Sequence, residues 1–297
     1  MNKIHPDIWL AGAPKSGTTT LFNLLAQHPK ICPSTPKEPF FFVDRDNPYR
    51  TKKEDYDSFF NKCEGDFLKL DGTSQSIYQD SILIDLAEEK PNSKAIFVLR
   101  EPASRIRSSF YFTSNNLAAV KNLTFPQYAE ILLSADVKRL LNYCKDKRAF
   151  FSLSHELSYS NYIQYLLAWR NTIGIESMLI LLFEDLKNDP LSVFEVVIRF
   201  LEIEPFEPLI EDVKSNETQR IRNKTVHYFF QNLYAKLGYN IPFKSTLRNI
   251  YINLQQNNES SNSDNEDIEA LMNLRQYFQK ANFQLARQFN LDLRNWS

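Results

Sequence analysis

A short apolar run that leads into a glycine-containing loop is the feature that most constrains the fold of this chain. Residues 8–13 read Ile-Trp-Leu-Ala-Gly-Ala, a pattern typical of a buried parallel strand that ends in a tight turn. From Thr18 the apolar residues recur at helical spacing, and His28 and Pro29 close that segment. The sequence therefore predicts a strand, a glycine loop and a helix in direct succession.

Two later apolar runs repeat this order of elements. Residues 95–99 form a predicted strand that ends before Arg100, and Pro102 stands where a proline opens a helix. Residues 178–183 form a third predicted strand, with helical patterns before and after it. Strands that alternate with helices predict an α/β fold, in which a central parallel sheet is flanked by helices in a three-layer, P-loop-type arrangement.

The chain is long enough for one large domain. Its 297 residues would bury roughly three quarters of the unfolded surface, and we expect residues 1–297 to form a single domain. Polar residues fill the tract 255–267, which predicts a mobile surface loop. Apolar residues over 268–289 recur at helical spacing and predict an amphipathic helix behind that loop.

Charge and cysteine content narrow the expected environment. The formal net charge is −1, so we expect no nucleic-acid partner. No apolar run is long enough to span a membrane, and the first residues lack a signal-peptide pattern. The three cysteines, Cys32, Cys63 and Cys144, are odd in number and match no metal-ligand spacing. We therefore expect a cytoplasmic chain with reduced cysteines and no structural metal.

The loop over residues 12–19 carries the first candidate binding residues. It reads Gly-Ala-Pro-Lys-Ser-Gly-Thr-Thr and joins the predicted strand to a helix N-terminus, where free backbone N–H groups favour an anion. Lys15 adds a positive charge, Gly17 lets the backbone approach the anion, and the neighbouring hydroxyl groups supply further donors. These residues predict a phosphate-binding loop.

The position of the lysine distinguishes this loop from the nucleotide-triphosphate motif. In that motif the lysine directly follows the second glycine, whereas here Thr18 follows Gly17 and the lysine is Lys15. A triphosphate site needs a lysine that reaches the outer phosphates and a hydroxyl for Mg²⁺. A shorter anion bound without a metal fits the loop better.

The loop resembles the 5′-phosphosulfate loop of the sulfotransferases that use 3′-phosphoadenosine 5′-phosphosulfate (PAPS). Those enzymes carry Pro-Lys-Ser-Gly-Thr-Thr, which is the sequence of residues 14–19. The resemblance implies PAPS as the sulfonate donor and no metal. It also implies that the 5′-phosphosulfate is bound by Lys15, Ser16, Gly17, Thr18, Thr19 and Thr20.

A second motif follows the predicted strand at 95–99. Residues 100–108 match the Arg-x-Pro-x-x-Arg-x-x-Ser motif of the same family, and the resemblance implies that Arg100 and Ser108 bind the 3′-phosphate. Arginine offers a planar set of donors to a phosphate, and a helix that begins at Pro102 turns its positive end to the same place. A strand-end arginine paired with a carboxylate is the alternative for Arg100 taken alone.

A third motif indicates the catalytic base. Residues 37–42, Lys-Glu-Pro-Phe-Phe-Phe, resemble the Glu-Pro-aromatic segment of the heparan-sulfate-type and bacterial branch. The resemblance implies that Glu38 removes the proton of the acceptor and that Lys15 also stabilises charge on the bridging oxygen. That branch usually carries a lysine where this chain has Gly72, so Asp71 beside it is an alternative base.

The acceptor is predicted only by class. A net charge of −1 disfavours a densely sulfated glycan, so we expect sulfonate transfer to a hydroxyl or amine of a saccharide or small polar metabolite. The oligomeric state stays open. The alternatives are a P-loop small-molecule kinase and an inactive protein that binds PAPS or its product. The cations Arg220, Arg222 and Lys224 form either a solvated surface or a segment that closes over the donor.

Overall fold

The computed structural model describes residues 5–209, apart from 64, 66, 90, 91, 117–119 and 121, and residues 261–296. Within these ranges five strands form one sheet, in which every pair is parallel and the spatial order is β2-β3-β1-β4-β5. The strands are β1 (Ile8–Gly12), β2 (Ile31–Pro33), β3 (Leu68–Asp71), β4 (Lys94–Leu99) and β5 (Met178–Leu182). The predicted parallel sheet is confirmed.

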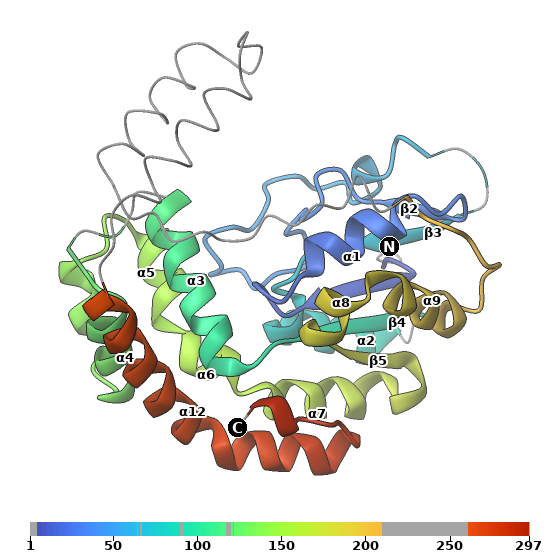
Figure 1. The fold of residues 1–297 in the computed structure, drawn as a ribbon. Helices are drawn as coiled ribbons and strands as arrows, with labels where there is room; N and C mark the ends of the chain where they lie inside the picture. The colour runs from blue at the N-terminus through green and yellow to red at the C-terminus, as the bar shows by residue number, and fades with distance from the viewer. Residues whose placement is uncertain are drawn as a thin grey trace, which may run out of the picture.

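Helices cover both faces of this sheet, also as predicted (Figure 1). They include α1 (Thr18–Leu25), α2 (Asp80–Glu89), α3 (Pro102–Asn116), α4 (Phe125–Leu133), α5 (Lys147–Ser154), α6 (Glu156–Ser160), α7 (Tyr162–Ile173), α8 (Phe183–Asn188), α9 (Pro190–Leu201) and α12 (Ser261–Phe289). The predicted helices that begin near Thr18 and at Pro102 are therefore present.

The alternation of side chains along each strand produces two cores. Trp9 of β1 and Phe97 of β4 belong to a core on the face covered by α2 and α7. Leu10 and Ile96, which are the sequence neighbours of Trp9 and Phe97, belong to a core on the opposite face, under α1 and α9. Successive strand residues point to opposite faces, so a continuously apolar strand needs cover on both.

A third apolar cluster joins helices gathered at one end of the sheet (Figure 1). Phe110 of α3, Phe125 of α4 and Phe278 of α12 all contribute to it. Helix α12 thus packs back onto the body of the protein, as its amphipathic pattern predicts.

The start of α12 corrects the prediction of a polar loop over 255–267. Residues 261–267 are helical, and residues 255–260 lie outside the described residues. Ser, Asn and Asp are favoured at the N-cap of a helix as well as in turns. Composition alone therefore did not distinguish a helix start from a loop in this tract.

The prediction of three reduced cysteines is also wrong for one pair. Cys32 and Cys63 form a disulfide whose Cα atoms are 5.9 Å apart, whereas Cys144 is free. The two residues are separated by 31 positions in the sequence, so their spacing carries no sign that they meet in space. The cysteines therefore no longer support the expectation of a cytoplasmic chain. None of the helices in the described ranges has the length and apolar character that crossing a membrane requires.

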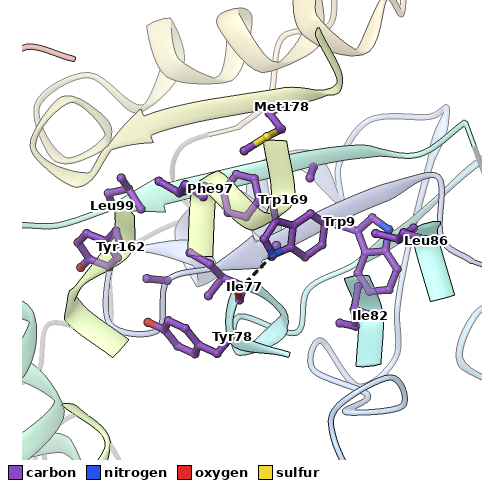
Figure 2. Packing of buried hydrophobic residues seen from close by; sticks show 14 of the residues in the cluster. Trp9, Ile77, Tyr78, Ile82, Leu86, Phe97, Leu99, Tyr162, Trp169 and Met178 are labelled. Carbon is purple, nitrogen blue, oxygen red and sulfur yellow. Dashed lines mark hydrogen bonds between the residues drawn. The ribbon is translucent and has the colours of Figure 1, made fainter. Parts of the chain in front are cut away.

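Trp169 of α7 lies at the centre of one core (Figure 2). Its ring is fully buried and stands edge-on to the rings of Trp9 and Phe97, with centroids 6.2 and 5.3 Å away. The indole Nε1 donates to the carbonyl of Ile77, 3.1 Å away. This bond satisfies the one polar group of the ring and ties α7 to the 3₁₀ helix η2 (Ser76–Tyr78), which follows β3.

We expect Trp169→Ala to lower the free energy of unfolding by about 3–5 kcal/mol, because it empties a fully packed site and leaves the Ile77 carbonyl without its donor. Urea denaturation measures the change. Phe283→Ala is the control, since the Phe283 side chain is exposed and its loss should cost less than about 0.5 kcal/mol. Equal effects of the two substitutions would contradict this account of the core.

Candidate active site

Three predicted site segments meet at one edge of the sheet. Strand β1 pairs with β3 on one side and β4 on the other, so the carboxyl ends of all three strands lie together. The loop 13–17 follows β1, Asp71 ends β3, and Arg100 follows β4. After β1 the chain adds β2 and β3 on one side of that strand and then crosses to β4 on its other side. This reversal is where open α/β sheets bind ligands.

The loop after β1 leaves the start of α1 open to an anion. Gly17 is the N-cap residue, with a φ of 85° in the left-handed region, and no side chain caps the helix. The first turn also contains no acidic residue. Ser16 Oγ is buried and has no hydrogen-bond partner within the described residues. Unpaired helix N–H groups and an unpaired hydroxyl fit a bound phosphate or sulfate group.

The three predicted threonines differ in exposure. Thr18 is buried, Thr19 is exposed and Thr20 is half-buried. The Oγ1 atom of Thr18 accepts a hydrogen bond from Lys37 Nζ at 3.4 Å. Its own hydroxyl proton is then available to an anion at the start of α1.

Lys15 lies in a confined, positively charged place. Its Nζ stands 3.7 Å from the ring centroid of Phe112. Burial, together with the nearby Arg100, lowers the pKa of Lys15 to about 8, while Glu38 acts in the opposite direction. An anion bound at the loop would favour the charged form of this lysine.

Arg100 connects the second motif to the first. Its Nη1 donates to the backbone carbonyl of Lys15 at 3.2 Å, and its guanidinium lies 4.5 Å from the ring centroid of Phe183. Tyr162 Oη in turn donates to the carbonyl of Arg100 at 2.9 Å. Among the described residues no carboxylate pairs with Arg100 within hydrogen-bond distance, so its donors stay directed at the loop.

The rest of the second motif lies on α3. Ser108 is half-buried, and its hydroxyl makes no hydrogen bond within the described residues. Arg105 is buried and pairs with Glu156 of α6, with a further bond from its Nε to Ser160 Oγ at 3.0 Å. The second arginine of the motif is therefore a structural link between α3 and α6.

Glu38 presents an oriented carboxylate. Its Oε1 accepts hydrogen bonds from Ser74 Oγ at 2.6 Å, from Ser74 N at 3.3 Å and from Lys37 Nζ at 3.2 Å. Its Oε2 has no hydrogen-bond partner within the described residues. One oxygen is thus held in place while the other has no partner among the described residues, which leaves it able to accept a proton from a substrate.

Asp71, the alternative base, is enclosed. It is buried and accepts hydrogen bonds from Tyr56 Oη at 2.9 Å and from Thr73 N at 2.8 Å. Burial raises the pKa of this carboxyl group. Its partners hold the turn after β3 in place, which favours a structural role.

Gly72 has no room for the lysine that the resemblance places there. A Cβ atom at this position would lie 2.6 Å from Phe22 Cδ2 and 2.8 Å from the Lys37 carbonyl oxygen. Sequence reasoning missed Ser74 and gave Lys37 no role. The sequence signal for these residues was only that Ser74 lies two positions after Gly72 and that Lys37 directly precedes Glu38. The cations at 220–224 lie outside the described residues.

This arrangement is that of an α/β protein that binds a phosphate-containing substrate. A family model described as "Sulfotransferase domain" matches residues 5–233, and the chain belongs to the sulfotransferase family. It is accordingly a PAPS-dependent sulfotransferase. None of the curated protein sequences compared with the chain matches it.

Three solved structures of sulfotransferases match the chain, and the first of them shares its fold. A sulfotransferase from Alicyclobacillus acidocaldarius is 20% identical, with a TM-score of 0.53, and the match covers 83% of this chain and 100% of that one. A sulfotransferase domain from the curacin biosynthetic pathway is 16% identical over 85% and 98% of the two chains, with a TM-score of 0.43. Mouse sulfotransferase SULT7A1 complexed with PAP is 15% identical over 90% of each chain, with a TM-score of 0.42.

The lowered pKa of Lys15 predicts proton uptake when an anion binds. Near pH 8 this lysine is partly neutral in the free protein, because its pKa is about 8. A bound anion raises that pKa, so adenosine 3′,5′-bisphosphate should bind with uptake of protons near this pH and without such uptake well below it. Calorimetric titration in buffers of different ionisation enthalpy measures the uptake. Lys15→Met should abolish it, and uptake that persists in this variant would assign it to another group.

Proposed function

We propose that this protein transfers the sulfonate of PAPS to a hydroxyl or amine of a saccharide or small polar metabolite by in-line displacement. One observation carries the proposal. Lys37 Nζ lies within hydrogen-bond distance of both Glu38 Oε1 and Thr18 Oγ1. The candidate base and the anion-binding loop thus share one ammonium group, which supports a base that stands beside the group to be transferred.

The remaining roles follow from position. Lys15 and the residues 16–20 would bind the 5′-phosphosulfate and offset charge on the phosphate oxygen that leaves. Arg100 and Ser108 would bind the 3′-phosphate. Because these side chains provide the positive charge and the donors, the proposal assigns no role to a metal ion.

Glu38 would take the acceptor proton at Oε2. The open state of this oxygen supports Glu38 over Asp71, whose carboxylate is buried and bonded to Tyr56 and Thr73. In the transfer, the bond from sulfur to the bridging phosphate oxygen breaks as the bond from the acceptor atom to sulfur forms. Adenosine 3′,5′-bisphosphate is the product that leaves.

Aromatic side chains beside Glu38 support a ring-bearing acceptor. Phe40 and Tyr49 stack with centroids 5.6 Å apart, and Phe151 of α5 lies edge-on to Tyr49 at 6.4 Å. Tyr49 Oη also shares a hydrogen bond of 2.8 Å with Ser152 Oγ. Half-buried rings with a few hydroxyl groups are typical of sites that bind small molecules.

We also propose that residues 1–297 act as one domain. Leu285 of α12 belongs to the same apolar core as Trp9 of β1, and Phe278 packs in the cluster around α3 and α4. These contacts join α12, near the end of the chain, to the first strand and to α3 and α4.

A calorimetric comparison of two nucleotides tests the donor site. We expect the protein to bind adenosine 3′,5′-bisphosphate more tightly than AMP, and Arg100→Ala to weaken the first by about 10- to 100-fold with little effect on AMP. Arg199→Ala is the control, because Arg199 is an exposed arginine paired only with Glu195 among the described residues. Preference for ATP with Mg²⁺ would favour the kinase alternative instead.

Glu38→Gln tests the base. Transfer from radiolabelled PAPS to a panel of glucosamine, maltose and para-nitrophenol should fall by about 10²- to 10⁴-fold, while binding of adenosine 3′,5′-bisphosphate is retained. Glu54→Gln removes an exposed carboxylate from the same segment and should leave both unchanged. Tight nucleotide binding without transfer to any acceptor in the wild-type protein would favour the inactive binding protein.

A further inference from the structure

Lys37 occupies the meeting point of three parts of the site. Its Nζ donates to Gly72 O at 3.1 Å, to Glu38 Oε1 at 3.2 Å and to Thr18 Oγ1 at 3.4 Å. These acceptors belong to the turn after β3, to the candidate base and to the first residue of α1. An ammonium group has three donors, so each donor has one acceptor.

The surroundings hold this ammonium in place. The Lys37 side chain is only 19% exposed, and its Nζ lies 5.7 Å from the ring centroid of Phe22. Ser34 Oγ donates to the backbone carbonyl of Lys37 at 2.8 Å, and Gly72 packs against that same carbonyl with no space for a Cβ. Both the backbone and the charged end of Lys37 are therefore fixed.

The contacts are long, so the ammonium can exchange the longest of them, the 3.4 Å contact with Thr18 Oγ1, for a further anion. All three exceed the about 2.7–2.9 Å of a strong charge-assisted hydrogen bond, so Nζ lies between its acceptors rather than close against one. Thr18 begins the helix whose N-terminus is open to an anion. A sulfonate there would face the negative charge of Glu38, and a cation between the two would offset their repulsion.

We propose that Lys37 binds the sulfonate group of the donor and holds Glu38 beside it, so that the site prefers the sulfonated donor to the desulfonated product. This inference rests on the proposed function and deepens it. Lys15 and Arg100 would serve the phosphate groups, which donor and product share. Lys37 would serve the one group that differs between them. The acceptor proton passes to Glu38 Oε2, and Lys37 keeps its own protons throughout.

Binding measurements without an acceptor test this assignment. Isothermal calorimetry would compare PAPS with adenosine 3′,5′-bisphosphate for the wild type and for Lys37→Met, Lys37→Arg and Lys52→Met. We expect Lys37→Met to weaken PAPS by about tenfold or more and the bisphosphate by less than about twofold, since only PAPS carries the sulfonate. Lys37→Arg keeps the charge and should recover part of the PAPS affinity. Lys52→Met removes an exposed lysine of the same segment and should match the wild type.

The outcomes separate the alternatives. Equal weakening of both ligands by Lys37→Met would make Lys37 a structural support of the loop and overturn the proposal. Unchanged affinity for both would overturn it as well. Retained binding of the bisphosphate shows that the variant is folded. If the wild type binds neither ligand, the proposed function itself fails and the role of Lys37 falls with it.

Discussion

The parallel pairing of β1 with β3 and β4 is the constraint on which the site depends. Because β1 lies between these strands, three segments that are distant in the sequence emerge at one edge of the sheet. The loop after β1 supplies an open helix N-terminus, Arg100 donates to that loop from the end of β4, and Ser74 reaches Glu38 from the turn after β3. A strand order in which β1 did not lie between β3 and β4 would separate these groups.

Buried hydrogen bonds hold the chain segments after β3 and β4 in place at this edge of the sheet. Tyr162 holds the carbonyl of Arg100, and seven residues later in the same helix Trp169 holds the carbonyl of Ile77. Helix α7 thus fixes the chain after β4 and the chain after β3 with two hydrogen bonds from one face. Both donors are buried, and a buried carbonyl that lost its partner would be costly. The positions of the candidate site residues therefore depend on buried contacts that do not themselves touch a substrate.

The fold could be predicted from local sequence, and so could the candidate binding motifs, whereas the surroundings of the proposed base could not. Continuous apolar strands and helix signals are local features, so the sequence predicts β1, β4 and β5. It does not predict β2 and β3, because both are short and β3 includes Lys69. The position of Glu38 depends on Ser74, which is 36 residues away. The disulfide between Cys32 and Cys63 depends on the same distant packing.

The proposed base and the proposed anion-binding loop are held in place in different ways. The loop is set by β1 and α1, whose geometry the core determines. Glu38 and Lys37 lie instead in a segment without long helices or strands, whose two ends are joined by the disulfide. Ser74 and Gly72 hold this segment near its beginning, at Glu38 and Lys37. Tyr49 in this segment packs against Phe151 of α5, and Phe40 stacks on Tyr49. Changes there can alter the acceptor without disturbing the sheet. The Lys37 ammonium connects both parts, because it contacts Thr18 on one side and Glu38 on the other.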